Sequence, residues 1–270
     1  MKPLVITVAG VGAELTREQQ PNLPLTAEEI GGDAADVAKA GASIYHLHVR
    51  DRLGRPTMDV DTYRAAHDAI REKTDLIVQF SSGGSVTDDE AARSAPLDLR
   101  PEMATLTTGT VNFGDEIFMN PGPLVSRLYS KMLSLDIQPE YEIFDAGMIA
   151  NAERAYDELG GQHHRHFDFV LGVPGAMPAW PDSISFLEAH LPNESTWTAI
   201  GIGRSHGAVA SEAIERGGHV RTGLEDVRFV GPGRPAGSNR ELVELVVKKA
   251  KEQGREVATP TQARELLGIG

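Results

Sequence analysis

The sequence predicts an α/β protein, a single (β/α)8 TIM barrel that occupies residues 1–270 as one domain. Three observations lead to this prediction. Eight short apolar segments are spread along the chain, amphipathic segments lie between them, and no linker or change of composition divides the sequence. Strands that alternate with helices in this way are typical of a parallel sheet whose strands are buried on both faces.

The expected strands are short and mostly apolar. In chain order they span residues 4–8, 44–49, 76–80, 103–107, 138–144, 167–171, 196–200 and 220–222. The segments between them have helical patterns. In the first one, Thr26 and Glu29 form a capping box at the start, and Gly41 is suited to end the helix in a left-handed conformation. Further helices are expected over residues 61–73, 88–94, 121–133, 146–159, 183–190, 206–216 and 240–253.

A doubly wound open sheet is the main alternative architecture. Its dinucleotide-binding form carries G-x-G-x-x-G directly after the first strand. Residues 9–14 read Ala-Gly-Val-Gly-Ala-Glu and lack the third glycine, and residues 201–203 come too late in the chain. The sequence therefore favours the barrel.

Composition excludes several classes of function. The 26 Lys and Arg residues against 39 Asp and Glu residues give a net charge of −13, which argues against a nucleic-acid or anionic-membrane partner. The absence of cysteine excludes disulfides, cysteine-based zinc or iron–sulfur sites and a cysteine nucleophile. No apolar run approaches the roughly 18 residues of a membrane span. The first residues are expected to form a strand rather than a signal peptide, so we expect a soluble cytoplasmic protein.

Function in such a barrel gathers at the carboxyl ends of the strands. His46 and His48 are two residues apart on a predicted strand and therefore face the same side. Two imidazoles are half of a divalent-metal site, and Glu225, after the last strand, is a candidate third ligand. Zinc is the expected ion, and manganese, iron and cobalt are compatible with the same donors. Alternatively, the histidines are ordinary core residues and Glu225 belongs to an acidic loop that caps a helix.

Other strands also end in polar groups. Glu14 follows the first strand, and Ser82 and Gly83 follow the third, where hydroxyl and amide donors suit a carboxylate or carbonyl oxygen. Thr107 ends the fourth strand. Glu142 lies near the end of the fifth, suited either to a cationic substrate group or to a structural ion pair. Each group alone also fits an ordinary turn, but their common location indicates one site.

Arg221 and Asp226 are candidates for separate roles. An arginine beside a metal can bind a carboxylate or an enolate oxygen, and Asp226 is placed to act as a general base. Alternatively, Asp226 orients a metal-bound histidine. A second H-x-H pair, His164 and His166, lies in a polar connection before a strand, so we expect it to be a solvated loop.

Five segments together resemble the β-keto acid cleavage enzymes over nearly the whole chain. They are PNLPLTAEEI at 21–30, AGASIYHLHVRD at 40–51, RPEMATLTTGTVNFG at 100–114, EIFD at 142–145 and GGHVRTGLED at 217–226. The resemblance implies a zinc-dependent barrel that converts a β-keto acid and acetyl-CoA into acetoacetate and a new CoA ester. It also implies a homo-oligomer, a tetramer.

The resemblance also assigns roles to residues. It implies zinc ligands at His46, His48 and Glu225, a catalytic arginine and aspartate at Arg221 and Asp226, an active-site glutamate at Glu14, and substrate contacts at Ser82 and Thr107. The implied reaction removes a proton from the keto acid, adds the carbanion to acetyl-CoA, transfers CoA and releases acetoacetate by retro-Claisen cleavage. The family motif commonly ends Glu-Asp-Asn, whereas Val227 stands here.

Two functions from other classes stay open. A metal-dependent hydrolase on the same barrel also begins with H-x-H, but it would need further histidine ligands at later strand ends. His206 and His219 are the available residues, and neither is expected to end a strand. A noncatalytic barrel that binds a small ligand would not need the arginine, glutamate and aspartate found here.

Overall fold

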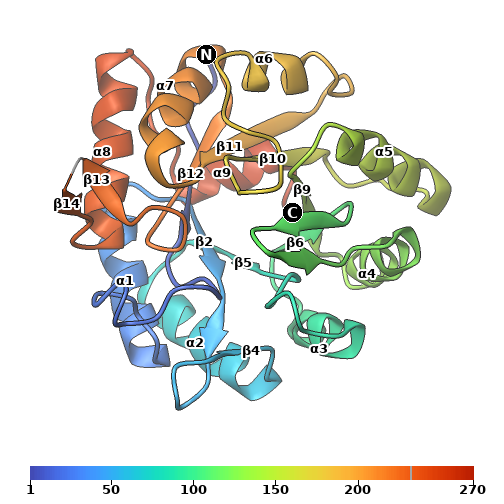
Figure 1. Ribbon diagram of the computed structural model, residues 1–270, viewed down its shortest axis with the longest axis horizontal. Helices are drawn as coiled ribbons and strands as arrows, with labels where there is room; N and C mark the ends of the chain where they lie inside the picture. Colours follow the sequence, from blue (N-terminus) through green and yellow to red (C-terminus); the bar gives the residue numbers. More distant parts are fainter. Residues whose placement is uncertain (232) are drawn as a thin grey trace.

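Eight parallel strands close into a barrel in the computed structural model, which describes residues 1–231 and 233–270 (Figure 1). Around the barrel the strands follow the order β1-β12-β11-β10-β9-β6-β5-β2. Their bounds are β1 Ile6–Ala9, β2 Ile44–Leu47, β5 Ile77–Phe80, β6 Met103–Thr107, β9 Gln138–Ile143, β10 His166–Leu171, β11 Thr196–Gly201 and β12 His219–Thr222. Every one overlaps an expected strand, so the predicted (β/α)8 barrel is confirmed.

Helices surround this barrel on its outer side, and the last of them lies across one end. They are α1 Ala27–Ala40, α2 Val60–Lys73, α3 Glu90–Ser94, α4 Gly122–Ser134, α5 Gly147–Leu159, α6 Ser183–Glu188, α7 His206–Arg216, α8 Asn239–Glu252 and α9 Pro260–Leu267. The predicted capping box is present at α1: the amide of Glu29 donates to the Thr26 hydroxyl at 3.2 Å, and the amide of Thr26 donates to the Glu29 carboxylate at 2.9 Å. Gly41 ends α1 with a φ of 116°.

Strand register places the last barrel strand, β12, beside the first, β1. Strand β1 pairs with β12 on one side, where Thr7 lies opposite Arg221, and with β2 on the other, where Ala9 lies opposite His46. All barrel strands are parallel, so their carboxyl ends and the following loops lie on the same face. The loop after β12 therefore lies close to the end of β2.

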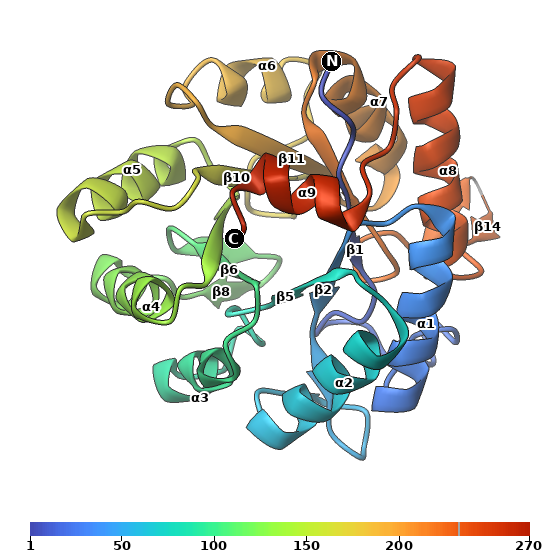
Figure 2. The same ribbon diagram turned by 180° about the vertical axis from the view of Figure 1, so that it is seen from behind.

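Helix α9 was not expected from the sequence. It begins at Pro260, a residue that suggests a helix break but is also well suited to the first turn, where its missing N–H is not needed. Figure 2 shows α9 lying across one end of the barrel. Its Ala263 and Leu267 pack against Val5 and Ile77, at the amino ends of their strands. The helix thus closes the end of the barrel opposite the predicted site.

Three short hairpins, also not expected, follow barrel strands at their carboxyl ends. They are β3–β4 (Val49–Arg50 and Pro56–Thr57), β7–β8 (Val111–Phe113 and Glu116–Phe118) and β13–β14 (Phe229–Gly231 and Arg234–Pro235). Because β–α loops carry them, they add walls to the face where strands β2, β6 and β12 end.

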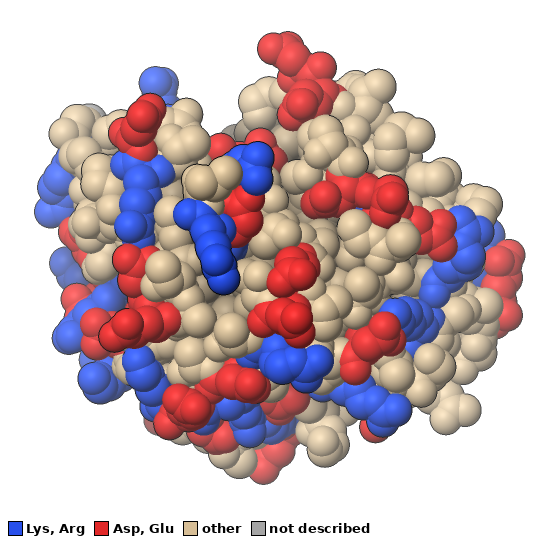
Figure 3. Space-filling view, turned by 90° about the horizontal axis from the view of Figure 1, so that it is seen from below, with Lys and Arg blue, Asp and Glu red and all other residues tan. Residues whose placement is uncertain are grey.

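Acidic and basic side chains are interspersed over the face shown in Figure 3. The net charge of −13 is therefore not gathered there in one continuous acidic field. None of the described helices has both the length and the apolar character needed to cross a bilayer.

Candidate active site

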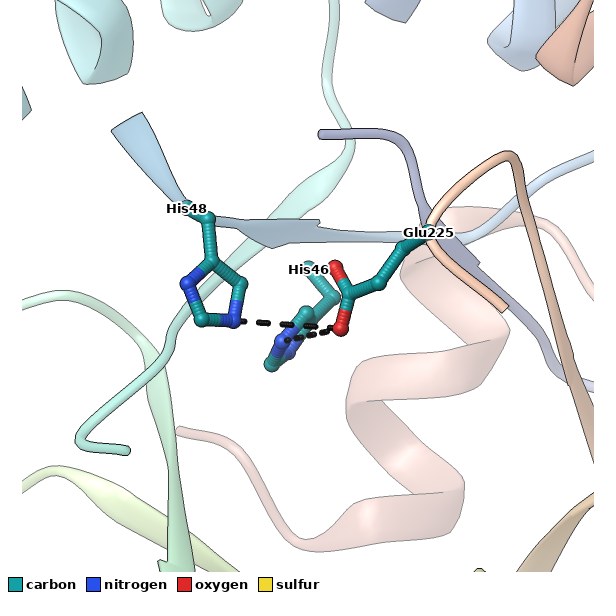
Figure 4. A group of neighbouring side chains, drawn as sticks. All are labelled: His46, His48 and Glu225. Atoms are coloured by element: carbon teal, nitrogen blue, oxygen red, sulfur yellow. Dashed lines mark ion pairs between the residues drawn. The ribbon is translucent and has the colours of Figure 1, made fainter. Parts of the chain in front are cut away.

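His46, His48 and Glu225 meet at the carboxyl-terminal face of the barrel. His46 belongs to β2, His48 follows it directly, and Glu225 lies in the loop after β12. The Nε2 atoms of both histidines lie 3.8 Å from the same Oε1 atom of Glu225 (Figure 4). Within residues 1–231 and 233–270, this is the one group of three or more His, Asp or Glu residues with the spacing of metal ligands.

The state of these donors fits a divalent cation. The Nδ1 atom of His46 lies 2.7 Å from Oε1 of Gln79, which leaves the Nε2 lone pair facing Glu225. Burial, followed by the positive charge of Arg221, lowers the pKa of His46 well below its ordinary value and that of His48 to about 3. The Oε2 atom of Glu225 is buried without a hydrogen-bond partner. The Oε1 atom, which faces both histidines, accepts a hydrogen bond from Arg221 at 2.6 Å. Two neutral imidazoles and this carboxylate are a mixed donor set that zinc accepts.

Gln79 is a residue that the sequence analysis missed. Its Nε2 donates to Oε1 of Glu140 at 2.9 Å, and this bond assigns the other end of the amide, the oxygen, to His46. The arrangement selects the His46 tautomer with the proton on Nδ1. The available signal was a single polar residue inside the apolar strand run Leu-Ile-Val-Gln-Phe.

Arg221 lies buried among four carboxylates. Its Nη2 donates to Oε1 of Glu225 at 2.6 Å, and its Nε and Nη2 donate to the two oxygens of Asp226 at 3.0 and 3.2 Å. Glu142 and Asp168 lie 3.5 and 3.6 Å from its Nη1. Burial raises the pKa of Asp226 to about 6, against the lowering effect of Arg221. Asp226 is thus a carboxylate at neutral pH with increased basicity, the state that a general base requires.

A cavity of about 1140 Å³ opens above these groups. Predicted site residues that line it are Glu14, His48, Gly83, Glu142, Arg221, Glu225 and Asp226. Ser82 and Thr107 lie behind its wall. The hydroxyl of Ser82 donates to the carbonyl oxygen of Thr105 at 2.5 Å, and the hydroxyl of Thr107 donates to Glu142 at 2.6 Å. In this arrangement Thr107 positions Glu142, and Ser81 is the serine that reaches the cavity.

The second H-x-H pair differs from expectation. His166 is not in a solvated loop; it starts β10 and is fully buried. Its Nε2 lies 3.1 Å from Oε2 of Glu140, and its Nδ1 lies 2.8 Å from the Thr196 hydroxyl. The Nε2 of His164 lies 2.8 Å from the same hydroxyl. The expectation was wrong for His166 because β10 begins at that residue and turns its side chain into the barrel.

The other two histidines considered as ligands also lie apart from the group of possible metal ligands described above. His219 lies at the amino end of β12, and its Nδ1 accepts a hydrogen bond from the amide of Val5 at 3.1 Å. His206 begins α7 and lines the cavity, with its Nε2 3.2 Å from the Thr222 hydroxyl. Neither completes the larger histidine set that a metal-dependent hydrolase would need.

Comparisons with known proteins identify the family of the chain. The family model described as beta-keto acid cleavage enzyme matches residues 3–269. The chain is 47% identical to the 3-keto-5-aminohexanoate cleavage enzyme of Fusobacterium nucleatum, over 100% of this chain and 99% of that protein. It is 46% identical, with the same coverage, to the enzyme of that name from Acetoanaerobium sticklandii. It is also 36% identical to the 3-oxoadipate:acetyl-CoA acetyltransferase of Cupriavidus necator, over 99% of this chain and 95% of that protein.

Among solved structures, the chain is similar to ObcA in its ternary complex with a C4-CoA adduct and oxalate. The TM-score is 0.79 at 21% identity, over 92% of this chain and 68% of ObcA, a likeness that concerns the fold alone. The family model and the relatives together cover almost every residue, and they agree with the resemblance found in the sequence. The chain belongs to the beta-keto acid cleavage enzyme family.

Proposed function

We propose that this enzyme converts a β-keto acid and acetyl-CoA into acetoacetate and a new acyl-CoA. The observation that carries the proposal is Arg221, which holds Asp226 as a carboxylate beside Glu225 and the two histidines. The group offers a proton acceptor and a site for an electrophile within one cavity. The names of the relatives from F. nucleatum and C. necator support the same type of reaction.

The metal part of the proposal concerns His46, His48 and Glu225. These residues would hold a divalent cation, with zinc as the first candidate and manganese, iron or cobalt as others. Such an ion supplies Lewis-acid polarisation of the keto oxygen and lowers the pKa of the neighbouring C–H group. The buried, unpartnered Oε2 of Glu225 and the proton on Nδ1 of His46 support this role.

The proposed chemistry of the chain's own residues starts at Asp226. Its carboxylate takes the proton from the carbon between the keto group and the carboxylate of the substrate. Arg221 remains charged throughout and holds Asp226 in place through two hydrogen bonds. Ser81 and Gly83 line the cavity, and the amide of Gly83 donates to the Ser81 hydroxyl at 3.1 Å. The Ser81 hydroxyl keeps its own proton and is suited to donate it to the substrate carboxylate.

The bonds balance without a protein nucleophile. The new carbanion forms a carbon–carbon bond to the thioester carbon of acetyl-CoA. The CoA thiolate is transferred to the original keto carbon, and the carbon–carbon bond between that carbon and the former carbanion carbon breaks. The carbanion released by this cleavage takes back the proton held on Asp226. Acetoacetate then leaves with the two carbons of the acetyl group, and the remaining acyl group leaves as its CoA ester. This scheme suits a chain without cysteine.

We also propose that the substrate carries a cationic group at the end remote from its carboxylate. Glu14 lines the cavity, and among the described residues it has no ion-pair partner. Glu142, in contrast, is held by Thr107 and lies near Arg221. Glu14 is therefore the carboxylate available to an ammonium group. The two relatives with 46–47% identity are named for 3-keto-5-aminohexanoate, which supports an amine in this position.

A homotetramer in the cytoplasm completes the proposal. Exposed apolar side chains on and beside the loops, Ile117, Met119 and Phe229, support association between copies. Light scattering after size-exclusion chromatography would test it, with a mass of four chains expected and a monomer as the contradicting result.

The test of the reaction is a screen of cationic, anionic and apolar β-keto acids with acetyl-CoA on metal-loaded enzyme, with acetoacetate as the readout. His46→Ala is measured in parallel, and its thermal melting confirms that it folds. We expect acetoacetate that depends on acetyl-CoA, is largest with a cationic keto acid and is lost in the variant. No turnover with any of the three classes, in a preparation shown to contain metal, would overturn the proposal.

A further inference from the structure

The cavity continues well beyond the groups that carry the proposed chemistry. At about 1140 Å³ it exceeds the roughly 300–1,000 Å³ of ordinary small-molecule sites, more than a short keto acid fills. One arm of it runs between the start of α7, helix α8 and the β13–β14 hairpin. Leu242, Leu245 and Val246 lie on one face of α8 and form its apolar wall, and Val230 adds to the wall from the hairpin.

Three basic side chains line this arm: Arg204 before α7, Arg228 after β12 and Lys249 on α8, one turn beyond Leu245. In the part of the chain that the structure describes, none of the three forms an ion pair with a carboxylate. Arg228 donates to the carbonyl oxygen of Gln19 at 3.3 Å, and Lys249 donates to the Ser211 hydroxyl at 2.9 Å.

These partners are neutral, so the three positive charges stay uncompensated in a chain with a net charge of −13. On the face shown in Figure 3, by contrast, basic and acidic side chains are interspersed. The three basic side chains give this arm of the cavity a local attraction for an anion.

The position of the arm also favours phosphate. Strands β11 and β12 are the seventh and eighth strands of the barrel, and the loops after these two strands form the phosphate site of many such barrels. Arg204 lies in the first loop and Arg228 in the second. At the start of α7, His206 is nine-tenths buried, lines the cavity, and has an Nδ1 atom without a hydrogen-bond partner. Burial and the nearby charge of Lys249 lower the pKa of His206 to about 4, so its side chain is a neutral polar group at neutral pH.

We infer that this arm binds the nucleotide end of acetyl-CoA, and that Arg204, Arg228 and Lys249 contact its phosphate groups. The inference rests on the proposed function, which supplies acetyl-CoA as the co-substrate. The apolar wall on α8 accommodates the pantetheine chain, and the thioester reaches Asp226 and Arg221 in the same cavity. The cationic arm thus selects the phosphate-bearing half of one substrate, while the barrel mouth selects the keto acid.

The test compares three thioesters: acetyl-CoA, acetyl-dephospho-CoA and acetyl-pantetheine, which lacks the whole nucleotide. The variants are Arg204→Gln, Arg228→Gln and Lys249→Gln. Matched controls are Arg216→Gln at the other end of α7, where the arginine pairs with Glu188, and Lys248→Gln, the neighbour of Lys249 that pairs with Glu252.

We expect each site variant to raise the KM for acetyl-CoA about tenfold, the effect of losing one charge-assisted hydrogen bond. The KM for acetyl-pantetheine and the kcat with either thioester stay unchanged, and the two control variants behave like the unaltered enzyme. A smaller effect of one variant with acetyl-dephospho-CoA would identify the residue that contacts the 3′-phosphate. Equal KM changes with acetyl-CoA and acetyl-pantetheine, or no changes, would overturn the inference.

Calorimetric titration with free CoA separates this inference from the reaction itself. If the enzyme makes no acetoacetate but binds CoA, and Arg204→Gln weakens that binding while Arg216→Gln does not, the site stands and the proposed reaction fails. If the enzyme turns over but none of the three variants changes the affinity for CoA, the reaction stands and the assigned site is wrong.

Discussion

The barrel contains two H-x-H pairs at opposite ends, and within the described residues only one of them builds a group with metal-ligand spacing. His46 and His48 lie at the carboxyl end of β2, where Glu225 faces both rings at 3.8 Å. His164 and His166 lie at the amino end of β10, where both rings share the hydroxyl of Thr196. The same sequence pattern therefore has two outcomes in one molecule.

The difference comes from what surrounds each pair. At the carboxyl end, the loops supply a carboxylate with an unpartnered oxygen, and a cavity admits ligands. At the amino end, hydroxyls satisfy the rings of His164 and His166, and α9 packs across the barrel. Glu140 connects the two regions, because it accepts from Gln79 toward His46 and faces His166 with its other oxygen. In this molecule, the H-x-H pair that faces a carboxylate with metal-ligand spacing is the pair at the carboxyl end of its strand.

Loss of a proposed metal ligand at the carboxyl end of the barrel should have the largest effect on metal content and turnover. Glu225→Gln removes the charged ligand, so we expect bound metal to fall to background and turnover to fall about 10⁴-fold or more, because the Lewis-acid contribution is worth several kcal/mol. Metal analysis and acetoacetate formation measure both. His166→Asn is the matched change at the other end, and it should keep the full metal content. Equal metal loss in both variants would contradict the proposal that only the pair at the carboxyl end binds metal.

Asp226→Asn separates proton transfer from metal binding. We expect kcat to fall about 10³-fold, within the usual range for a general base, with unchanged metal content. A solvent-exchange assay of the substrate C–H group measures the step directly, and its rate should fall in parallel. If exchange continues at the original rate, Asp226 is not the base.

Gln79→Leu tests the hydrogen-bond connection between His46 at the carboxyl end of the barrel and Glu140 in its interior. Without the amide oxygen, His46 loses the partner that fixes its tautomer, so metal affinity should fall 10–100-fold. Competition with a chromophoric chelator measures the affinity, and the visible spectrum of the cobalt-loaded enzyme reports the geometry. Gln138→Leu, a buried glutamine on β9 that donates only to backbone oxygens, is the control and should leave the affinity unchanged.

At the amino end, replacements should affect stability instead of chemistry. His166→Leu removes the buried partner of the Oε2 atom of Glu140 and one of the two ring partners of the Thr196 hydroxyl, so we expect the free energy of unfolding to fall by about 1–3 kcal/mol. Urea denaturation measures this change, with kcat within about twofold of the unaltered enzyme. A large loss of kcat with unchanged stability would mean that the amino end takes part in the reaction.

The smallest expected effect is the contribution of His164 to the pH dependence of the free energy of unfolding. Burial, followed by the charge of His166, lowers the pKa of His164 to about 4 in the folded chain, below its ordinary value of 6.5. The unfolded chain therefore binds more protons between these values, and stability falls as pH decreases from 6.5 towards 4. His164→Gln should reduce this slope slightly, since the side chain is only half-buried. Unfolding midpoints in urea across this pH range measure the slope, and an unchanged slope would contradict the assignment.

Local patterns in the sequence determined much of this protein. Apolar runs and the capping box at Thr26 depend on neighbouring residues, so they predicted the barrel strands and the limits of α1. The period of two along a strand is equally local, and it is enough to place His46 and His48 on the same side. The position of Glu225, Arg221 and Asp226 at or after the last predicted strand then suggested them as companions, and the family resemblance implied the same residues.

Only the tertiary structure decided which distant residues meet. Closure of β1 between β12 and β2 brings Glu225 to His46, and the barrel interior joins Gln79 to Glu140. The arm lined by Arg204 and Lys249 likewise depends on how α7, α8 and a hairpin pack together. These contacts join segments that are far apart in sequence, so no local period encodes them. They arise from closure of the barrel and from the packing of loops that follow different strands.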